Sequence, residues 1–292
     1  MIRIDRGPEP RGLKIAAPKR LKTAAEAFNQ HGTPSKALTE TLTGYGSQKT
    51  KLALFCAQHG KCAWCERHTD FSSAPVEHYR PKDGAWRNLP DKPRRVDAGH
   101  YWWLAWTWSN LLFSCARCND AGHKANYFPL HPTMAPAAAP IAPLTIPPPS
   151  PIVDVSAEQA LLLDPAGRED PLDHITWLPG NTSFDRSEWI WSPSGLTEEG
   201  RATIAILKLD ELAGRAQGHV RYQLLPSIEE VEQHLAADRT KEAHKRWNRF
   251  LTNNLSPSAE WTAFTWHALK HLVPIAFRQQ HQLAEPTRPG AP

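Results

Sequence analysis

Four of the five cysteines in this chain form two Cys-x2-Cys pairs, Cys62 with Cys65 and Cys115 with Cys118, about fifty residues apart. Two intervening residues allow both thiolates of a pair to reach one tetrahedral zinc ion at about 2.3 Å. A single pair is also typical of thioredoxin-like redox proteins, but two pairs without further clustered cysteines favour a Zn(Cys)4 site. Such a closed site is structural, because it leaves no coordination position open for water. Any chemistry must therefore come from residues that the zinc ion holds together.

The composition predicts a reducing compartment for these cysteines. No run of the sequence approaches the ~18 uninterrupted apolar residues of a spanning helix, and Met1–Gly12 lacks the apolar core of a signal peptide. We therefore expect a cytoplasmic protein without membrane contact. Disulfides are disfavoured in a reducing cytoplasm, which again favours zinc. The fifth cysteine, Cys56, lies in a helix-like segment at 51–59, and we expect its thiol to be a buried apolar filler.

Charge is unevenly distributed along the chain. Residues 1–60 carry ten Lys and Arg against four Asp and Glu, residues 61–131 carry ten against seven, and residues 132–292 carry 14 against 19. A basic front half predicts contact with an anion, for which nucleic acid is the leading candidate. Scattered surface charge is the alternative explanation.

Polar residues with catalytic potential lie between the cysteine pairs and directly after the second pair. Glu77 and His78 follow the first pair by about twelve residues, Asn110 leads into an apolar run that ends at the second pair, and Asn119 follows Cys118. The apolar runs around Glu77 and after Asn110 predict two short strands. The residues from 117 onward predict the start of a helix, so the second pair lies at a strand-to-helix turn.

This order of residues resembles the zinc-ribbon class of HNH endonucleases with four cysteine ligands, whose active site is a treble-clef-like ββα-metal module. The three letters of the motif would be His78, Asn110 and Asn119, with Asn in the last place. The chain is also similar to a subfamily that includes the HNH subunits of Septu-type and retron-associated antiphage systems, which work beside an ABC/SMC-like ATPase. The segments that carry this similarity are GKCAWCE at 60–66, EHYRPK at 77–82, FPL at 128–130, LLLDP at 161–165 and EDP at 169–171. The resemblance is strong over 55–130, moderate over 1–15 and 158–212, and absent after about 225.

The residue types at this site suit phosphodiester hydrolysis. A neutral imidazole at His78 can deprotonate water near pH 7. Glu77 and Asn119 offer a carboxylate and an amide oxygen, the ligand types that Mg²⁺ or another divalent cation prefers. Because neighbouring side chains on a strand point to opposite faces, Glu77 and His78 can meet one ion only if the strand bends. The resemblance implies that Asn110 orients the loop that carries the histidine.

Basic residues near this set are candidates for contact with nucleic acid. They are Arg80, Lys82, Arg94, Arg95, His123 and Lys124. Arg94 and Arg95 lie in the 31-residue segment between His78 and Asn110, which we interpret as an exposed loop along a phosphate backbone or a solvated insertion. The tryptophan-rich run at 101–108 favours core packing over base stacking.

The chain divides into four regions. Residues 1–60 form a basic helical region, 61–131 the nuclease module, 132–151 a linker or surface insertion with eight prolines, and 152–292 a mixed, mostly helical region. Expected helices cover 16–30, 48–59, 198–217, 227–253 and 258–282, a strand covers 160–164, and strand-like pieces lie within 176–191. The tail from 285 onward is expected to be disordered. Asp164, Asp170 and His174 belong to the resemblance but have no assigned mechanism.

Taken together, the residues and the resemblance predict an α+β protein built on a ββα-metal module braced by Zn(Cys)4. The expected activity is metal-dependent HNH endonuclease cleavage, with DNA as the leading substrate, in antiphage defence. A zinc ribbon that binds nucleic acid without cutting it and a zinc-braced adaptor are the alternatives. The sequence holds no Gly-x4-Gly-Lys-Ser/Thr motif, so an ATP-driven step through a P-loop would belong to a partner subunit.

Overall fold

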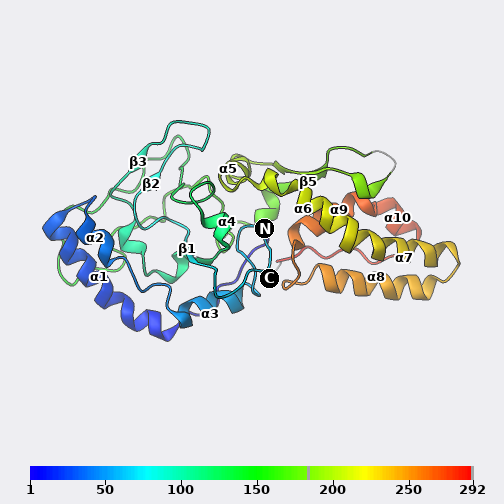
Figure 1. The fold of residues 1–292 in the computed structure, drawn as a ribbon, viewed down its shortest axis with the longest axis horizontal. Helices are drawn as coiled ribbons and strands as arrows, with labels where there is room; N and C mark the ends of the chain where they lie inside the picture. The colour runs from blue at the N-terminus through cyan, green and yellow to red at the C-terminus, as the bar shows by residue number, and fades with distance from the viewer. Residues whose placement is uncertain (183–184, 291–292) are drawn as a thin grey trace.

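The chain combines helices with three two-stranded antiparallel sheets in a computed structural model that describes residues 1–182 and 185–290. This arrangement confirms the α+β class. The small sheets lie in the first two thirds of the chain, and the last third is largely helical (Figure 1). None of the described helices is long and apolar enough to cross a membrane.

The N-terminal half contains helices and two of the small sheets. Its elements are α1 (Arg11–His31), α2 (Lys36–Thr41), α3 (Gln48–Ala57), β1 (Val76–His78), β2 (Ala85–Trp86), β3 (Val96–Asp97), β4 (Leu111–Phe113) and α4 (Ala116–Asn119). Strand β1 pairs with β4, and the β2–β3 hairpin is inserted between them in the sequence. Helix α1 begins earlier than predicted, because Pro10, whose ring presets its φ of −59°, precedes its first turn.

The helix predicted from residue 117 onward is only one turn long. Cys115 caps α4 by accepting a hydrogen bond from the backbone N–H of Cys118 at 3.4 Å. Asp120 then accepts the backbone N–H of Gly122 at 2.7 Å. This local side-chain bond competes with the helical backbone bonds, so the chain turns instead of continuing the helix.

The tryptophan-rich segment forms core. Tyr101, Trp102, Trp103 and Trp106 are all buried, which confirms the prediction of packing over base stacking. The segment folds as two short 3₁₀ turns, Trp102–Leu104 and Trp108–Asn110. The ring of Trp102 packs against Phe28 of α1 with centroids 5.2 Å apart, so this cluster joins the N-terminal helix to the β1–β4 sheet.

The proline-rich stretch at 132–151 contains neither helix nor strand, and it follows the surface. The side-chain amide of Asn29 in α1 donates to the carbonyl of Leu144 at 2.9 Å and accepts the N–H of the same residue at 2.5 Å. Leu144 and Ile146 also pack against the core. These contacts hold the stretch to α1.

The C-terminal half contains a β-hairpin and a set of helices. Its elements are β5 (Ile175–Pro179), β6 (Trp191–Gly195), α5 (Glu198–Leu207), α6 (Ala213–His219), α7 (Leu225–Ala236), α8 (Thr240–Asn254), α9 (Thr262–Leu272) and α10 (Ile275–Gln280). The three long helices predicted here are each divided. Lys208 and Asp238 adopt left-handed backbone conformations with φ of 46° and 56°, and Pro274 ends the third helix because it lacks an N–H.

The motif residues without an assigned mechanism have structural contacts. Asp164 forms an ion pair with Arg6 at 3.1 Å, and Asp170 pairs with Arg288 at 2.7 Å. His174 Nδ1 lies 2.8 Å from the hydroxyl of Thr197, which caps α5. These residues therefore anchor segments that are distant in sequence.

Two further predictions for this half are wrong. Residues 160–164 do not form a strand. A single bridge joins Ala160 to Leu130, and the N–H of Leu163 donates instead to the side-chain hydroxyl of Thr203 at 2.9 Å. The tail is also not free within the described residues, since Arg288 is bound to Asp170 and Asp173.

Candidate metal centre and active site

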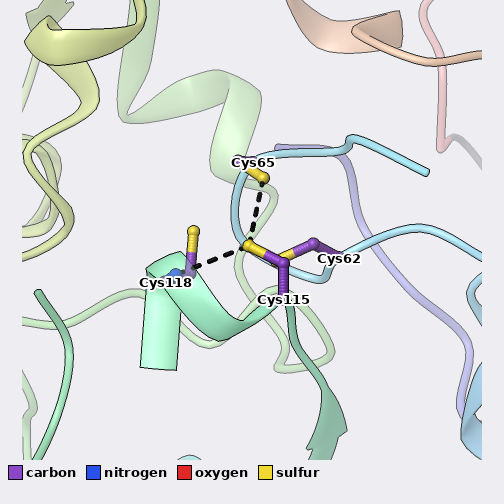
Figure 2. A group of neighbouring side chains, drawn as sticks. All are labelled: Cys62, Cys65, Cys115 and Cys118. Atoms are coloured by element: carbon purple, nitrogen blue, oxygen red, sulfur yellow. Dashed lines mark hydrogen bonds between the residues drawn. The ribbon is translucent and has the colours of Figure 1, made fainter. Parts of the chain in front are cut away.

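The four paired cysteines converge on one point. Their sulfur atoms all lie within 4.8 Å of one another, and the sulfurs of Cys65 and Cys115 are 3.9 Å apart (Figure 2). Four sulfurs at 2.3 Å from one tetrahedral zinc ion would be separated by roughly 3.8 Å. The cluster could therefore hold a zinc ion, as its spacing in the sequence predicted.

Two local structures position the sulfurs. The first pair lies in a turn after α3, where the N–H of Cys62 donates to the carbonyl of Arg67 at 2.9 Å. The N–H of Ala63 donates to the carbonyl of Phe113 at 3.0 Å, which ties this turn to β4 and thus to the second pair. Hydrogen bonds from the neighbouring cysteines lower the pKa of Cys115, so the cluster favours a thiolate at that position.

Cys56 is exposed, so the prediction of a buried filler is wrong. Helix α3 buries Thr50 and Leu54. Cys56 follows Leu54 by two residues, about 200° around the helix, and thus faces away from the core.

His78 ends strand β1 and is enclosed by three different segments. It pairs with Leu111 of β4, and its ring packs against that of Tyr45 in a T-shaped arrangement with centroids 4.3 Å apart. Its Nε2 lies 3.0 Å from the carbonyl oxygen of Ala105. A carbonyl can only accept, so Nε2 carries the proton and donates. Burial lowers the pKa of His78 to about 3, which keeps the imidazole neutral.

The other ring nitrogen of His78, Nδ1, has no hydrogen-bond partner among the described residues. Nδ1 is also not one of the fully buried polar atoms that lack a hydrogen bond. A neutral imidazole with Nε2–H presents an unprotonated lone pair on Nδ1. The side chain can therefore accept a proton from a water molecule at Nδ1.

Glu77 lies beside Lys124, and both side chains are buried. The Nζ atom of Lys124 is 2.6 Å from Oε1 of Glu77 and 2.5 Å from the backbone carbonyl oxygen of His78. Burial raises the pKa of Glu77, and the ammonium of Lys124 opposes this shift. Lys124 is 0% exposed, which does not fit the prediction that it contacts nucleic acid. Its charge stabilises the carboxylate instead.

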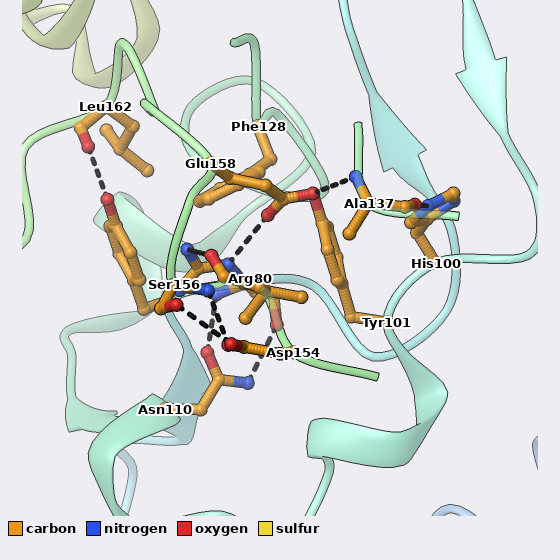
Figure 3. A network of polar contacts seen from close by, with 12 residues as sticks. Arg80, His100, Tyr101, Asn110, Phe128, Ala137, Asp154, Ser156, Glu158 and Leu162 are labelled. Carbon is orange, nitrogen blue, oxygen red and sulfur yellow. Dashed lines mark hydrogen bonds and ion pairs between the residues drawn. The ribbon is translucent and has the colours of Figure 1, made fainter. Parts of the chain in front are cut away.

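Asn110 holds the turn that follows His78. Its side-chain oxygen accepts the N–H of Arg80 at 2.7 Å, and its NH₂ group donates to the carbonyls of Arg80 and Leu104 at 3.0 and 3.3 Å (Figure 3). Asn110 is buried, so these bonds are not exchanged for water. This geometry has the form of the loop-orienting role that the resemblance implied.

Asn119 is the last residue of α4 and is half-buried. Among the hydrogen bonds of the described residues, none joins Asn119 to Glu77 or His78. Lys124, rather than Asn119, is the residue from the end of the module that contacts both of them.

The basic residues predicted to bind nucleic acid differ in their surroundings. Arg94 and Arg95 are exposed on the β2–β3 hairpin, and the guanidinium of Arg94 lies 3.6 Å from the ring centroid of Trp86. Lys82 is half-buried, with its Nζ 5.6 Å from the ring centroid of Tyr45.

Two of the predicted contacts face other protein groups. Arg80 pairs with buried Glu158 at 3.1 Å (Figure 3). His123 is 9% exposed and lies between Asp120 and Glu211, at 2.7 and 3.3 Å. Neither side chain is free to contact a phosphate in this conformation.

Two residues at the site were not found from the sequence. Tyr45 contacts His78, and burial together with the charge of Glu77 raises its pKa. Glu158 binds Arg80, the hydroxyl of Tyr101 and the N–H of Ala137 (Figure 3). The glycines on both sides of Tyr45 signal a turn, but no local pattern indicates what the tyrosine touches.

The fold and the site define an α+β protein with a four-cysteine cluster that could bind zinc beside a buried histidine. The chain is 31% identical over 176 residues to "Septu protein PtuB" from Bacillus mycoides (strain KBAB4), which covers 60% of this chain and 54% of the relative. The chain therefore spans about half the length of the curated relative that it matches. No protein-family model matches this chain, and no solved structure matches it significantly.

Proposed function

We propose that this protein is a metal-dependent HNH endonuclease that hydrolyses phosphodiester bonds in DNA. The observation that carries the proposal is the geometry of His78: its Nε2–H donates to the Ala105 carbonyl at 3.0 Å, which fixes the ring, and its Nδ1 forms no hydrogen bond with a described residue. A general base must be unprotonated and must present a free lone pair to the attacking water molecule, and the Nδ1 atom of this ring meets both requirements. The antiparallel pair β1–β4, followed by the one-turn helix α4, has the order of a ββα module.

The other residues have supporting roles. Asn110 holds the turn after His78 and is thus a positioning residue. Glu77 and Asn119 are the candidate donors for a catalytic divalent cation such as Mg²⁺, since they offer oxygen ligands. The cation would stabilise the charge that develops on the scissile phosphate and on the leaving 3′ oxygen. Lys124 pairs with Oε1 of Glu77 at 2.6 Å.

The exposed arginines of the β2–β3 hairpin are candidates for DNA contacts. Arg94 and Arg95 project from a segment that is exposed from 91 to 96. Arginines in this setting bind phosphate oxygens without reading the base sequence. The zinc ion would hold the turn after α3 against β4 and α4, and so fix the end of the module.

We also propose that the protein acts in antiphage defence. This part rests on the similarity to Septu protein PtuB and on the resemblance of the motifs to HNH subunits of such systems. An ABC/SMC-like ATPase would be the partner subunit, as the resemblance to such HNH subunits implies.

The test is cleavage of plasmid and phage DNA by the purified protein, with and without a co-encoded ATPase, in Mg²⁺ and in EDTA. We expect cleavage that requires Mg²⁺ and that falls by roughly 10²–10⁴-fold in His78→Ala, the usual contribution of a general base. His31→Ala, at an exposed histidine of α1, is the matched control. Zinc content is measured in every sample. Cleavage that His78→Ala or EDTA leaves unchanged contradicts the mechanism, and binding without cleavage favours a zinc-ribbon binding protein.

A further inference from the structure

Helix α8 carries a cationic face that plays no part in the site described above. It consists of Lys241, Lys245, Asn248, Arg249 and Thr252, which we call the α8 cationic face. All five residues are exposed. They recur every three or four positions and therefore share one side of the helix. Ala243, Trp247 and Phe250 are buried on the opposite side.

The cations of this face form no ion pairs within the described residues. Arg246, at the edge of the buried side, pairs with Glu230 of α7 and with Glu242, at 3.3 and 2.9 Å. Over residues 1–182 and 185–290, no carboxylate forms an ion pair with Lys241, Lys245 or Arg249. These charges thus remain available to a ligand.

The concentration of charge on α8 does not follow from the composition of its region. Residues 132–292 carry 14 Lys and Arg against 19 Asp and Glu, yet five of these 14 cations lie within 239–249, where Glu242 is the single acid. Lys241 and Lys245 are four positions apart, as are Lys245 and Arg249. Like charges at that spacing destabilise a helix, so the fold gains nothing from this arrangement by itself.

We infer that the α8 cationic face binds the phosphate backbone of duplex DNA. Lysine, arginine, asparagine and threonine are the side chains that bind phosphate and sugar oxygens. The face has no aromatic residue on which the bases of a single strand could stack. It also lacks the apolar and aromatic residues that form the centre of a protein–protein interface, where lysine is depleted. The choice of DNA over RNA rests on the proposed function.

The dimensions of the face suit this ligand. From Lys241 to Arg249 the helix rises by roughly 12 Å. A DNA duplex presents about seven phosphate charges over that length, counting both strands. In Figure 1, α7 and α8 extend side by side from the middle of the molecule toward the end opposite α1 and α2. The face would thus hold DNA away from the β1–β4 module.

The test measures DNA binding without cleavage. A fluorescent DNA duplex is titrated with the full chain in a His78→Ala background, without added Mg²⁺, over a series of salt concentrations. We expect the triple variant Lys241→Gln, Lys245→Gln, Arg249→Gln to bind the duplex at least about tenfold more weakly near 0.1 M salt. The negative slope of log K against log salt should become less steep by about 3. Glutamine keeps the helix propensity, and circular dichroism checks the fold.

A second triple variant separates this face from net charge. Arg168→Gln, Arg215→Gln and Arg221→Gln remove three exposed cations of the same region that lie outside α8. We expect this variant to retain most of the affinity and of the salt slope. An equal loss in both triple variants would overturn the inference, as would unchanged binding in the α8 variant.

Two further arms test the identity of the ligand. An RNA duplex and a single DNA strand are titrated in parallel. The assignment to duplex DNA is overturned if either of them binds more tightly than the DNA duplex and the α8 variant loses that binding. Light scattering measures the mass of the protein in solution. If the α8 face instead binds the acidic α7 of a second copy, the α8 variant changes this mass and leaves DNA binding intact. None of these measurements requires cleavage. The inference about α8 can therefore fail while the nuclease proposal stands, and the nuclease proposal can fail while the inference about α8 stands.

Discussion

Lys124 and Glu77 form an ion pair in the interior of the protein, with Nζ 2.6 Å from Oε1 and side chains that are 0% and 7% exposed. The same ammonium donates to the backbone carbonyl of His78. The pair thus joins the segment after α4 to the end of β1. Its stability depends on both partners, since a buried charge without a partner is costly.

We predict that Lys124→Met destabilises the protein by about 3–5 kcal/mol, because it leaves the Glu77 carboxylate buried and unpaired. Urea denaturation measures the free energy of unfolding. The double variant with Glu77→Gln should recover part of the loss, as it removes the orphan charge. Lys22→Met is the control, since the exposed pair of Lys22 with Glu26, 3.9 Å apart, is worth about 0–1 kcal/mol. Equal losses in Lys124→Met and Lys22→Met would show that the buried pair has no special role.

The cysteine cluster predicts one zinc ion per chain. Cys115→Ser should release the zinc and lower the melting temperature, because three thiolates and a hydroxyl hold zinc poorly and structural zinc contributes directly to folding. Elemental analysis and a thermal melt measure the two effects. Cys56→Ser is the matched control, since its exposed thiol lies outside the cluster. A Cys115→Ser protein that keeps a full equivalent of zinc would contradict the four-cysteine site.

Asn110 provides a test of positioning in the proposed nuclease. Asn110→Ala leaves the N–H of Arg80 without its acceptor and frees the turn after His78. We expect kcat to fall by about 10²-fold, the effect of a small misplacement of a catalytic group, with little change in KM for DNA. Asn110→Asp keeps the acceptor but loses both donated bonds, so its activity should be intermediate. Asn126→Ala, which removes a single bond to Asp83, is the control. A loss confined to KM would argue against a positioning role.

His267 should make stability depend on pH. It is 2% exposed, and burial lowers its pKa to about 3. The unfolded chain, with a pKa near 6.5, binds more protons than the folded chain between these values, so stability falls as the pH drops below about 6.5. The cost is about 2 kcal/mol at pH 5. His267→Gln should lose this share of the pH dependence, while the shares of His78 and His219, whose pKa values burial lowers to about 3 and about 4, remain.

The measurement for His267 is the change in unfolding free energy between about pH 7 and pH 5. Any effect of acid on the cysteine cluster is common to the wild type and the variant, so it cancels in their difference. His31→Gln, at an exposed histidine, should behave as the wild type. The same pH dependence in His267→Gln and in the wild type would refute the prediction.

Several features of the fold followed from local patterns. The Cys-x2-Cys spacing predicted the cluster because a two-residue gap fixes the separation of the sulfurs within each pair. The strands around Val76 and at 111–113 followed from apolar runs bounded by breaks. The long C-terminal helices were predicted as continuous because Lys208 and Asp238, where two of them break, carry no glycine or proline signal.

The sequence alone thus determined which cysteines converge, which class of fold surrounds them and which histidine is the candidate base. Only the tertiary structure decided where the side chains point: Lys124 inward to Glu77, His123 between two carboxylates, and Cys56 to solvent. The physical reason is the range of the interactions. Ligand spacing and hydrogen-bonding periodicity act over a few residues, whereas the partner of a long charged side chain depends on segments that meet only after the chain has folded.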